Sequence, residues 1–173
     1  MSGRGYEAAL QSAGILAVLA QFDPHVAGTP PLGLDMPGSD IDILCHAPDA
    51  GAFARAVWAA FAEHAGFAMH QWTSSVRPVI ASFRAEGWEF EIFGDAVPVR
   101  EQAGWRHFMV ERRLLALGGE GFRTAVMQAR STGMKTEPAV AAVLGLGGDP
   151  YAALLMIEDW EDERLIALLR DGL

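Results

Sequence analysis

The stretch G28-TPPLGLDMPGSDID-I43 contains the residues on which the interpretation of this chain depends. Its last part alternates polar and apolar residues, which predicts a β-strand with Asp40 and Asp42 on one face. Ile41 and Ile43 then point into a core. Side chains two positions apart on a strand lie about 6–7 Å from each other. The two carboxylates therefore repel each other unless a cation neutralises them, and Mg²⁺, which prefers oxygen ligands, is the cation we expect.

A turn rich in glycine and proline precedes this acidic pair. Gly28 and Thr29 are separated from Asp40 by ten residues, and Gly38 and Ser39 come directly before it. Glycine lets a backbone approach a ligand closely, and N–H groups exposed in such turns bind phosphate oxygens. The turn is therefore a candidate phosphate-binding loop.

The Gly-Thr pair, the ten-residue gap and the Asp-Ile-Asp segment together resemble the signature of the DNA polymerase beta-like nucleotidyltransferase superfamily. Thr29 stands where serine is commoner. The resemblance implies an α+β fold, in which helices flank a small mixed sheet and the C-terminal half is helical. We expect a single domain over 1–173, with a nucleotidyltransferase-like core over about 6–98 and a helical part over about 99–173.

A third carboxylate comes from a later strand of the same sheet in this superfamily. The segment 88–94 alternates cleanly, with Glu89 and Glu91 on the face opposite Trp88, Phe90 and Ile92. Such a pair of glutamates also fits an ordinary polar sheet face. We prefer Glu91 over Glu89, because its Glu-Ile-Phe-Gly context resembles a group of small uncharacterised bacterial members of the superfamily.

Three further candidates lie in the part expected to be helical. Arg106 and Lys135, the only lysine of the chain, could add positive charge beside a triphosphate. His107 is expected off the apolar stripe of its helix, and its i, i+4 spacing to Glu111 suits a metal-ligand pair, a proton relay or a surface hydrogen-bonded pair. Lys135 is equally compatible with an exposed loop. A P-loop is excluded there, because the required glycine and preceding strand are missing.

The resemblance implies a Mg²⁺-dependent transfer of a nucleoside monophosphate from a nucleoside triphosphate such as ATP to a hydroxyl group. Asp40, Asp42 and Glu91 would hold one or two Mg²⁺ ions, and the candidates at positions 28, 29, 38, 39, 106, 107 and 135 would contact the nucleotide. The alternative is a non-catalytic nucleotide-binding or antitoxin-like module with the same fold. A metal-dependent phosphohydrolase is a weaker alternative.

Charge and hydropathy limit the partners and the location. The net charge is −9, which disfavours long nucleic acid, although residues 77–135 hold nine Arg and Lys against seven acids. We therefore expect the acceptor to be a small molecule or a protein. The sequence has no run of 18 apolar residues and no secretory signal, so we expect a cytoplasmic protein without membrane contact. The single cysteine, Cys45, is expected in the core.

Periodicity and capping residues also predict the elements along the chain. The expected strands cover 25–27, 40–45, 67–72, 79–84 and 88–94, with turns at Ser74-Ser75 and 85–87. The expected helices cover 6–22, about 50–65, 100–117, 121–130, 139–146, 151–157 and 165–169, with Asp49 and Asp149 as N-caps.

Overall fold

The computed structural model describes residues 5–73 and 77–172. These residues form two units, which we call the sheet unit (Met1–Trp105) and the helical unit (Arg106–Leu173). The turn expected at Ser74-Ser75 lies outside the described residues. Within the described part of the chain, no helix is long and apolar enough to cross a membrane.

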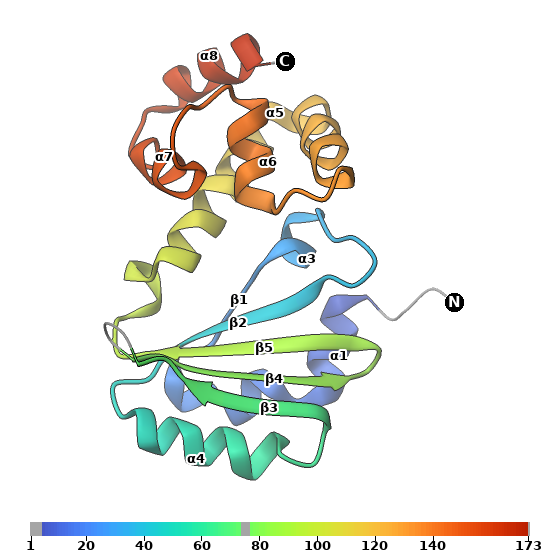
Figure 1. The fold of residues 1–173 in the computed structure, drawn as a ribbon, viewed down its shortest axis with the longest axis vertical. Coiled ribbons are helices and arrows are strands. Elements are labelled where there is room, and N and C mark those ends of the chain that lie inside the picture. The colour runs from blue at the N-terminus through green and yellow to red at the C-terminus, as the bar shows by residue number, and fades with distance from the viewer. Residues whose placement is uncertain (1–4, 74–76, 173) are drawn as a thin grey trace. The chain divides into compact units, whose positions relative to one another are not determined.

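The sheet unit is built on one mixed, five-stranded sheet with the order β1-β2-β5-β4-β3 (Figure 1). Its strands are β1 (His25–Ala27), β2 (Asp40–His46), β3 (Ala65–Gln71), β4 (Val79–Ala85) and β5 (Trp88–Asp95). The central pair, β2 and β5, is parallel, whereas all other pairs are antiparallel. Glu86 and Gly87, both with positive φ, form the two-residue turn of the β4–β5 hairpin, as expected from the sequence.

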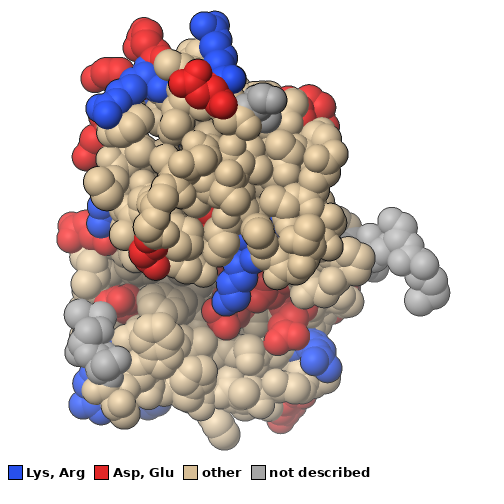
Figure 2. Space-filling model, turned by 45° about the horizontal axis from the view of Figure 1, so that its top comes forward, with Lys and Arg blue, Asp and Glu red and all other residues tan. Residues whose placement is uncertain are grey.

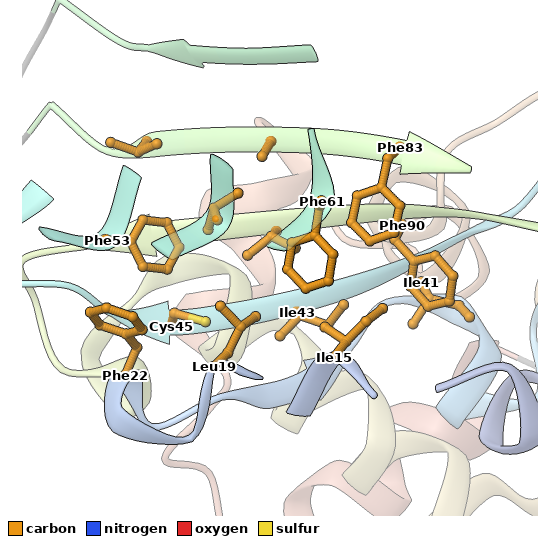
Figure 3. Close-up of a cluster of buried hydrophobic side chains, with 14 of the residues drawn as sticks. Ile15, Leu19, Phe22, Ile41, Ile43, Cys45, Phe53, Phe61, Phe83 and Phe90 are labelled. Carbon is orange, nitrogen blue, oxygen red and sulfur yellow. The ribbon is translucent and has the colours of Figure 1, made fainter. Parts of the chain in front are cut away.

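One face of the sheet carries the hydrophobic core of this unit (Figure 3). Ile41, Ile43, Phe90 and Ile92 are fully buried, as the alternation predicts. They pack against the N-terminal helices and α4, which supplies Phe53, Val57 and Phe61. The helical elements of the unit are α1 (Tyr6–Ala13), α2 (Ile15–Val18), η1 (Ala20–Phe22), α3 (Thr29–Leu32), α4 (Ala50–Phe61) and η2 (Val99–Glu101). Cys45 also lies in this core, and burial raises the pKa of its thiol to about 12.

The C-terminal half is helical, as the resemblance implies. Its elements are α5 (Ala103–Ser131), which begins at the end of the sheet unit, α6 (Thr136–Val143), α7 (Pro150–Met156) and α8 (Asp162–Gly172). α5 is interrupted at Gly119, whose backbone is not helical (φ 60°, ψ −151°), so it consists of the two helices expected on either side of 118–119. Asp49 and Asp149 are N-caps as predicted, because each side chain accepts a hydrogen bond from the N–H three residues later.

Several predicted boundaries are wrong, including that of the helix expected over 165–169, which is α8 (Asp162–Gly172). The helix expected over 6–22 breaks at Gly14, which has φ 63°, and Val18 is 40% exposed instead of facing the core. Part of the glycine- and proline-rich turn expected before Asp40 forms the short helix α3, whose first turn accepts two prolines. The helix expected over 50–65 ends at Phe61, and β3 begins at Ala65. The helix expected over 139–146 already begins at Thr136, because Pro138 fits a first turn.

Candidate functional site on the open face of the sheet

The register of the central strand pair brings the two acidic segments together. In the parallel β2–β5 pair, Asp42 lies beside Glu91 and Asp40 lies beside Glu89. Neighbouring strands are about 4.8 Å apart, and residues in register project from the same face. The four acids therefore share one face of the sheet, opposite the core. This adjacency of the downstream glutamates to the Asp pair depends on tertiary structure and cannot be read from the sequence.

The backbone at Gly28 packs directly against the Asp42 carboxylate. Ala27 on β1 is the register partner of Asp42, so the chain turns at Gly28 exactly beside this side chain. A Cβ atom on Gly28 would lie 2.1 Å from Oδ2 of Asp42. Gly28 also has φ 78° and ψ −164°, a combination that only glycine adopts readily. Glycine is therefore required here both by the backbone conformation and by the close approach of the carboxylate.

We expect Gly28→Ala to destabilise the sheet unit by about 1–3 kcal/mol, the usual cost of such backbone strain. The same substitution should displace the Asp42 carboxylate, because the added methyl group overlaps it. Urea unfolding measures the first effect, and the carboxyl ¹³C signal of Asp42 reports the second.

Gly38→Ala is the matched control. Gly38 also has a positive φ (90°), but a Cβ there would meet nothing within 4 Å. This variant should lose stability without moving Asp42. An unchanged Asp42 signal in Gly28→Ala would contradict the proposed packing.

The neighbours on β4 distinguish the two glutamates of β5. Glu89 lies beside Arg84, and the Arg84 Nε atom is 3.6 Å from a Glu89 carboxylate oxygen. Glu91 lies beside Ser82, an uncharged residue that is half-buried. Glu89 is thus an exposed member of a cross-strand ion pair, whereas Glu91 is the more enclosed acid and lies directly beside Asp42.

The turn between β1 and β2 holds the other sequence-predicted residues of this unit. Thr29 begins α3, and the following residues Pro30 and Pro31 have no N–H, so only Gly28 and Thr29 offer backbone donors at positions 28–31. Ser39 closes the turn, because its Oγ atom accepts a hydrogen bond of 2.9 Å from the Met36 N–H. The Ser39 hydroxyl therefore already has a structural contact.

Arg106 and His107 have partners within the helical unit. Both Nε and Nη2 of Arg106 donate to the Glu158 carboxylate, with Nε at 2.9 Å. The Arg106 guanidinium lowers the pKa of Glu158 below its usual range. His107 is buried, not off the apolar stripe as predicted, and its Nε2 atom donates to the Tyr151 carbonyl at 3.0 Å. A second ion pair in this unit joins Arg113 to Asp162.

Lys135 and Glu111 occupy contrasting environments in the helical unit. Lys135 is exposed and precedes α6 directly. Glu111 is 5% exposed, and its Oε1 atom is buried without a hydrogen-bond partner among the described residues. Burial, and secondarily the negative charge of Glu137, raise the pKa of Glu111 to about 8. The sequence pattern does not reveal this buried acid, because its i, i+4 relation to His107 equally fits an exposed pair.

The acids on the sheet have the right chemistry for a hard divalent cation, since all their donor atoms are carboxylate oxygens. Within residues 5–73 and 77–172, however, no three His, Cys, Asp or Glu side chains converge closely enough to hold a metal ion. Rotation of the side chains on their strands would be needed for a shared ligand set. On the face that Figure 2 shows, basic side chains lie singly or in small groups among acidic ones.

Comparison with known proteins provides a family and a fold. A family model described as a domain of unknown function (DUF4269) matches residues 8–157. No curated protein matches the chain. The solved structures similar to it include the GLD-2/RNP-8 complex, with 12% identity and a TM-score of 0.55 over 94% of this chain and 72% of that one. They also include the Cid1 poly(U) polymerase, with 14% identity and a TM-score of 0.53 over 89% of this chain and 47% of that one.

A third similar structure is the non-canonical poly(A) polymerase complex GLD-2–GLD-3, with 13% identity and a TM-score of 0.54 over 78% of this chain and 48% of that one. The chain thus spans about half the length of the Cid1 and GLD-2–GLD-3 chains that it matches. At these identities the likeness defines the fold, which is nucleotidyltransferase-like.

Proposed function

The chain belongs to the DUF4269 family, and within this family and fold we propose that it is a Mg²⁺-dependent nucleotidyltransferase. It would transfer a nucleoside monophosphate from a nucleoside triphosphate to a hydroxyl group of a small molecule or a protein. One observation carries the proposal. In the nucleotidyltransferase-like fold, the turn at Gly28, the Asp42 carboxylate and Glu91 occupy one line across three adjacent strands, with Asp40 on the same face.

The similar structures give independent support. They include poly(A) and poly(U) polymerases, and one Cid1 structure contains MgGTP. Those activities are stated for those proteins alone. For this chain they support a nucleoside triphosphate as the donor and a divalent cation as the cofactor.

We assign the role of metal ligands to Asp40, Asp42 and Glu91. A bound Mg²⁺ would lower the pKa of the acceptor hydroxyl and neutralise the charge that develops on the phosphate oxygens. The N–H groups of Gly28 and Thr29, with the Thr29 hydroxyl, would donate hydrogen bonds to the triphosphate. Gly38 would allow the chain to turn before Asp40 by its positive φ, and Ser39 would stabilise this turn by accepting the hydrogen bond from the Met36 N–H.

The chemical step is an in-line displacement at the α-phosphorus. In this step the acceptor oxygen would give its proton to solvent water and form a bond to the α-phosphorus, while the bond from that phosphorus to the oxygen bridging to the β-phosphorus breaks. Pyrophosphate leaves with the electron pair of the broken bond. We assign Glu91 to the side of the site where the acceptor hydroxyl binds. Glu91 is the register partner of Asp42 on the side away from Gly28.

The basic candidates of the helical unit have secondary roles in this proposal. Lys135 is exposed, and a lysine ammonium group carries the charge that neutralises a phosphate. Arg106 would first have to leave Glu158, and His107 would have to leave the Tyr151 carbonyl. We therefore propose that these two residues contribute through the stability of the helical unit, with direct phosphate contact requiring a rearrangement.

The experiment that tests the proposal is a thermal-shift screen of ATP, GTP, CTP and UTP with and without Mg²⁺, followed by mass spectrometry of acceptor mixtures. We expect at least one triphosphate to raise the Tm only when Mg²⁺ is present, together with pyrophosphate release and a product heavier by one nucleotidyl group. If no triphosphate shifts the Tm in a Mg²⁺-dependent manner, the proposal is wrong.

A non-catalytic nucleotide-binding module is the second candidate. It is favoured by the finding that no three potential ligands converge among the described residues. This candidate predicts nucleotide binding without pyrophosphate release in the presence of either small-molecule extracts or proteins.

Glu91→Gln should lower the rate of transfer by at least about 100-fold, since a carboxylate ligand supplies several kcal/mol to a metal-assisted transition state. Glu89→Gln should change the rate by less than about threefold, because exposed ion pairs such as Arg84–Glu89 contribute little. Pyrophosphate release at saturating triphosphate measures both effects. The reverse order of the two variants would assign the third carboxylate to Glu89.

A further inference from the structure

From the strand order we infer where the acceptor binds: on the β4–β3 side of the acids, between Ser82 and Trp72, with a planar ring of the acceptor against Trp72. This inference rests on the proposed function and deepens it. It names the side of the site that receives the acceptor and the chemical class of the acceptor, a hydroxyl compound that carries a flat ring.

The strand pairing gives the site a direction. Ala27 pairs with Asp42, Asp42 with Glu91, and Glu91 with Ser82. Gly28 therefore lies on one side of the two acids, and Ser82 lies on the other. Figure 1 shows the same order, with β1 and β2 on one side of β5 and with β4 and β3 on the other.

The in-line geometry of phosphoryl transfer then separates the two substrates. The attacking and leaving oxygens lie on opposite sides of the phosphorus. If the β- and γ-phosphates bind at Gly28 and Thr29, the leaving pyrophosphate lies on the β1 side of Asp42. The attacking hydroxyl must therefore approach from the side of Glu91 and Ser82.

Ser82 suits a contact with an incoming hydroxyl. Residues directly opposite each other in an antiparallel pair have Cβ atoms about 4.5–5.5 Å apart, which places the Ser82 side chain beside Glu91 on the same face. A serine hydroxyl both donates and accepts hydrogen bonds. At the equivalent position beside Glu89, β4 has Arg84, which is exposed and faces its own ion pair. Of the two glutamates on β5, only Glu91 therefore has a hydroxyl residue as its register partner on β4.

An apolar row lies next to the acids on this face. Leu44, Phe93 and Ile80 are register partners, each two positions along its strand from Asp42, Glu91 and Ser82 respectively. Leu44 and Ile80 are buried, and Phe93 is half-buried. Because side chains alternate along a strand, this row shares the face of the acids and forms an apolar border to the site.

Trp72 contacts this border at Phe93 and has a partly exposed ring. Its indole meets the Phe93 ring edge-on, with centroids 6.1 Å apart and planes at 80°, and the residue is 49% exposed. The backbone N–H of Trp72 donates a hydrogen bond to the Pro78 carbonyl at 3.0 Å. This bond continues the β3–β4 pairing and fixes the backbone at Trp72. A large aromatic ring, anchored but half-exposed next to the apolar row that borders the acids, is suited to stacking with a flat ligand ring.

The spacing limits the size of the acceptor. Successive residues on one face of a strand are about 6–7 Å apart, and Trp72 lies one ring contact beyond Phe93. The distance from the reacting hydroxyl to the stacked ring is thus on the order of 10 Å, as estimated from strand spacing. A glycoside or nucleoside with an aromatic ring spans this distance, whereas a simple aliphatic alcohol does not reach Trp72.

Phenyl β-D-glucoside and methyl β-D-glucoside are matched probes, because they have the same sugar hydroxyls and differ only in the ring. Their binding is measured by saturation-transfer NMR, both without nucleotide and with Mg²⁺ plus an α,β-methylene triphosphate. We expect the wild-type protein to bind the phenyl glucoside at least about fivefold more tightly than the methyl glucoside. Trp72→Ala should remove this preference and leave the affinity for the Mg²⁺–triphosphate unchanged within twofold.

Trp58→Ala is the matched control, since Trp58 is 59% exposed but lies on α4, which packs on the core face of the sheet. It should retain the preference for the phenyl compound. Equal binding of the two glucosides to the wild type, or an unchanged preference in Trp72→Ala, would overturn the inference. If the wild-type protein does not bind the Mg²⁺–triphosphate, the proposed function is wrong. The comparison of the two glucosides without nucleotide would then still test the role of Trp72.

Discussion

Asp42→Asn should reduce nucleotidyl transfer by about 1,000-fold or more and abolish the Mg²⁺-dependent thermal shift with triphosphate. Asp42 lies between the Gly28 turn and Glu91, so it is the one carboxylate placed to bridge the phosphate side and the acceptor side of the site. An amide of the same shape keeps the packing against Gly28 but removes the negative charge that holds a divalent cation. The Tm without ligands should therefore change little.

The measurement is a Tm series with increasing triphosphate, at fixed Mg²⁺, for wild type and variant. Asp35→Asn is the matched control, because Asp35 is an exposed acid in the same β1–β2 connection and should leave the series unchanged. A Mg²⁺-dependent shift that persists in Asp42→Asn would exclude Asp42 as a metal ligand. A large fall in the ligand-free Tm would instead indicate that the carboxylate has a structural role at Gly28.

The stability of the helical unit should fall as the pH rises from about 5 to about 8, because of Glu111. Burial raises the pKa of Glu111 to about 8, whereas an unfolded glutamate titrates near 4.5. In this window the unfolded chain has lost a proton that the folded chain retains, so stability decreases with pH. The slope is about 1.4 kcal/mol per pH unit, and the loss over the whole window is on the order of 4–5 kcal/mol.

Glu111→Gln should remove most of this pH dependence, since the amide is neutral at every pH. Hydrogen exchange of the α5 amides at pH 5, 6.5 and 8, corrected for intrinsic rates, measures the local free energy of opening. Glu120→Gln, at an exposed position just after the Gly119 break in α5, should keep the wild-type slope. Glu137→Gln should lower the pKa of Glu111 in the folded protein, because the charge of Glu137 contributes to raising it. The loss of stability should then end at a lower pH than in the wild type. A wild-type profile that is flat from pH 5 to 8 would contradict a buried, protonated Glu111.

Local patterns predicted much of the sheet unit. The alternation around Asp40 and Glu91 identified β2 and β5 and the faces of their side chains, because a half-buried strand has a period of two residues. Asp49 and Asp149 marked helix starts, since a capping carboxylate acts over three residues. The break at Gly14 was missed, because the apolar spacing continues through it while the backbone turns left-handed.

The burial of His107 and Glu111 also could not be predicted from the sequence pattern. An i, i+4 pair on a helix is compatible with an exposed or a buried face, and only packing within the helical unit decides between them. The pairing of Arg106 with Glu158 joins residues 52 positions apart, a separation over which sequence alone gives no preference among many acids.

By itself, the sequence determined the strand that carries Asp40 and Asp42, the glycine turn before it and the alternation that exposes Glu91, because each depends on contacts between residues close in the chain. The tertiary structure alone decided that Glu91 lies beside Asp42, that Gly28 touches the Asp42 carboxylate, and that Ser82 and Trp72 lie on the opposite side of the acids. The physical reason is the parallel pairing of β2 with β5. Its register is set by burial of Ile41, Ile43, Phe90 and Ile92 in one core, and a shift by one residue would turn the acids inward.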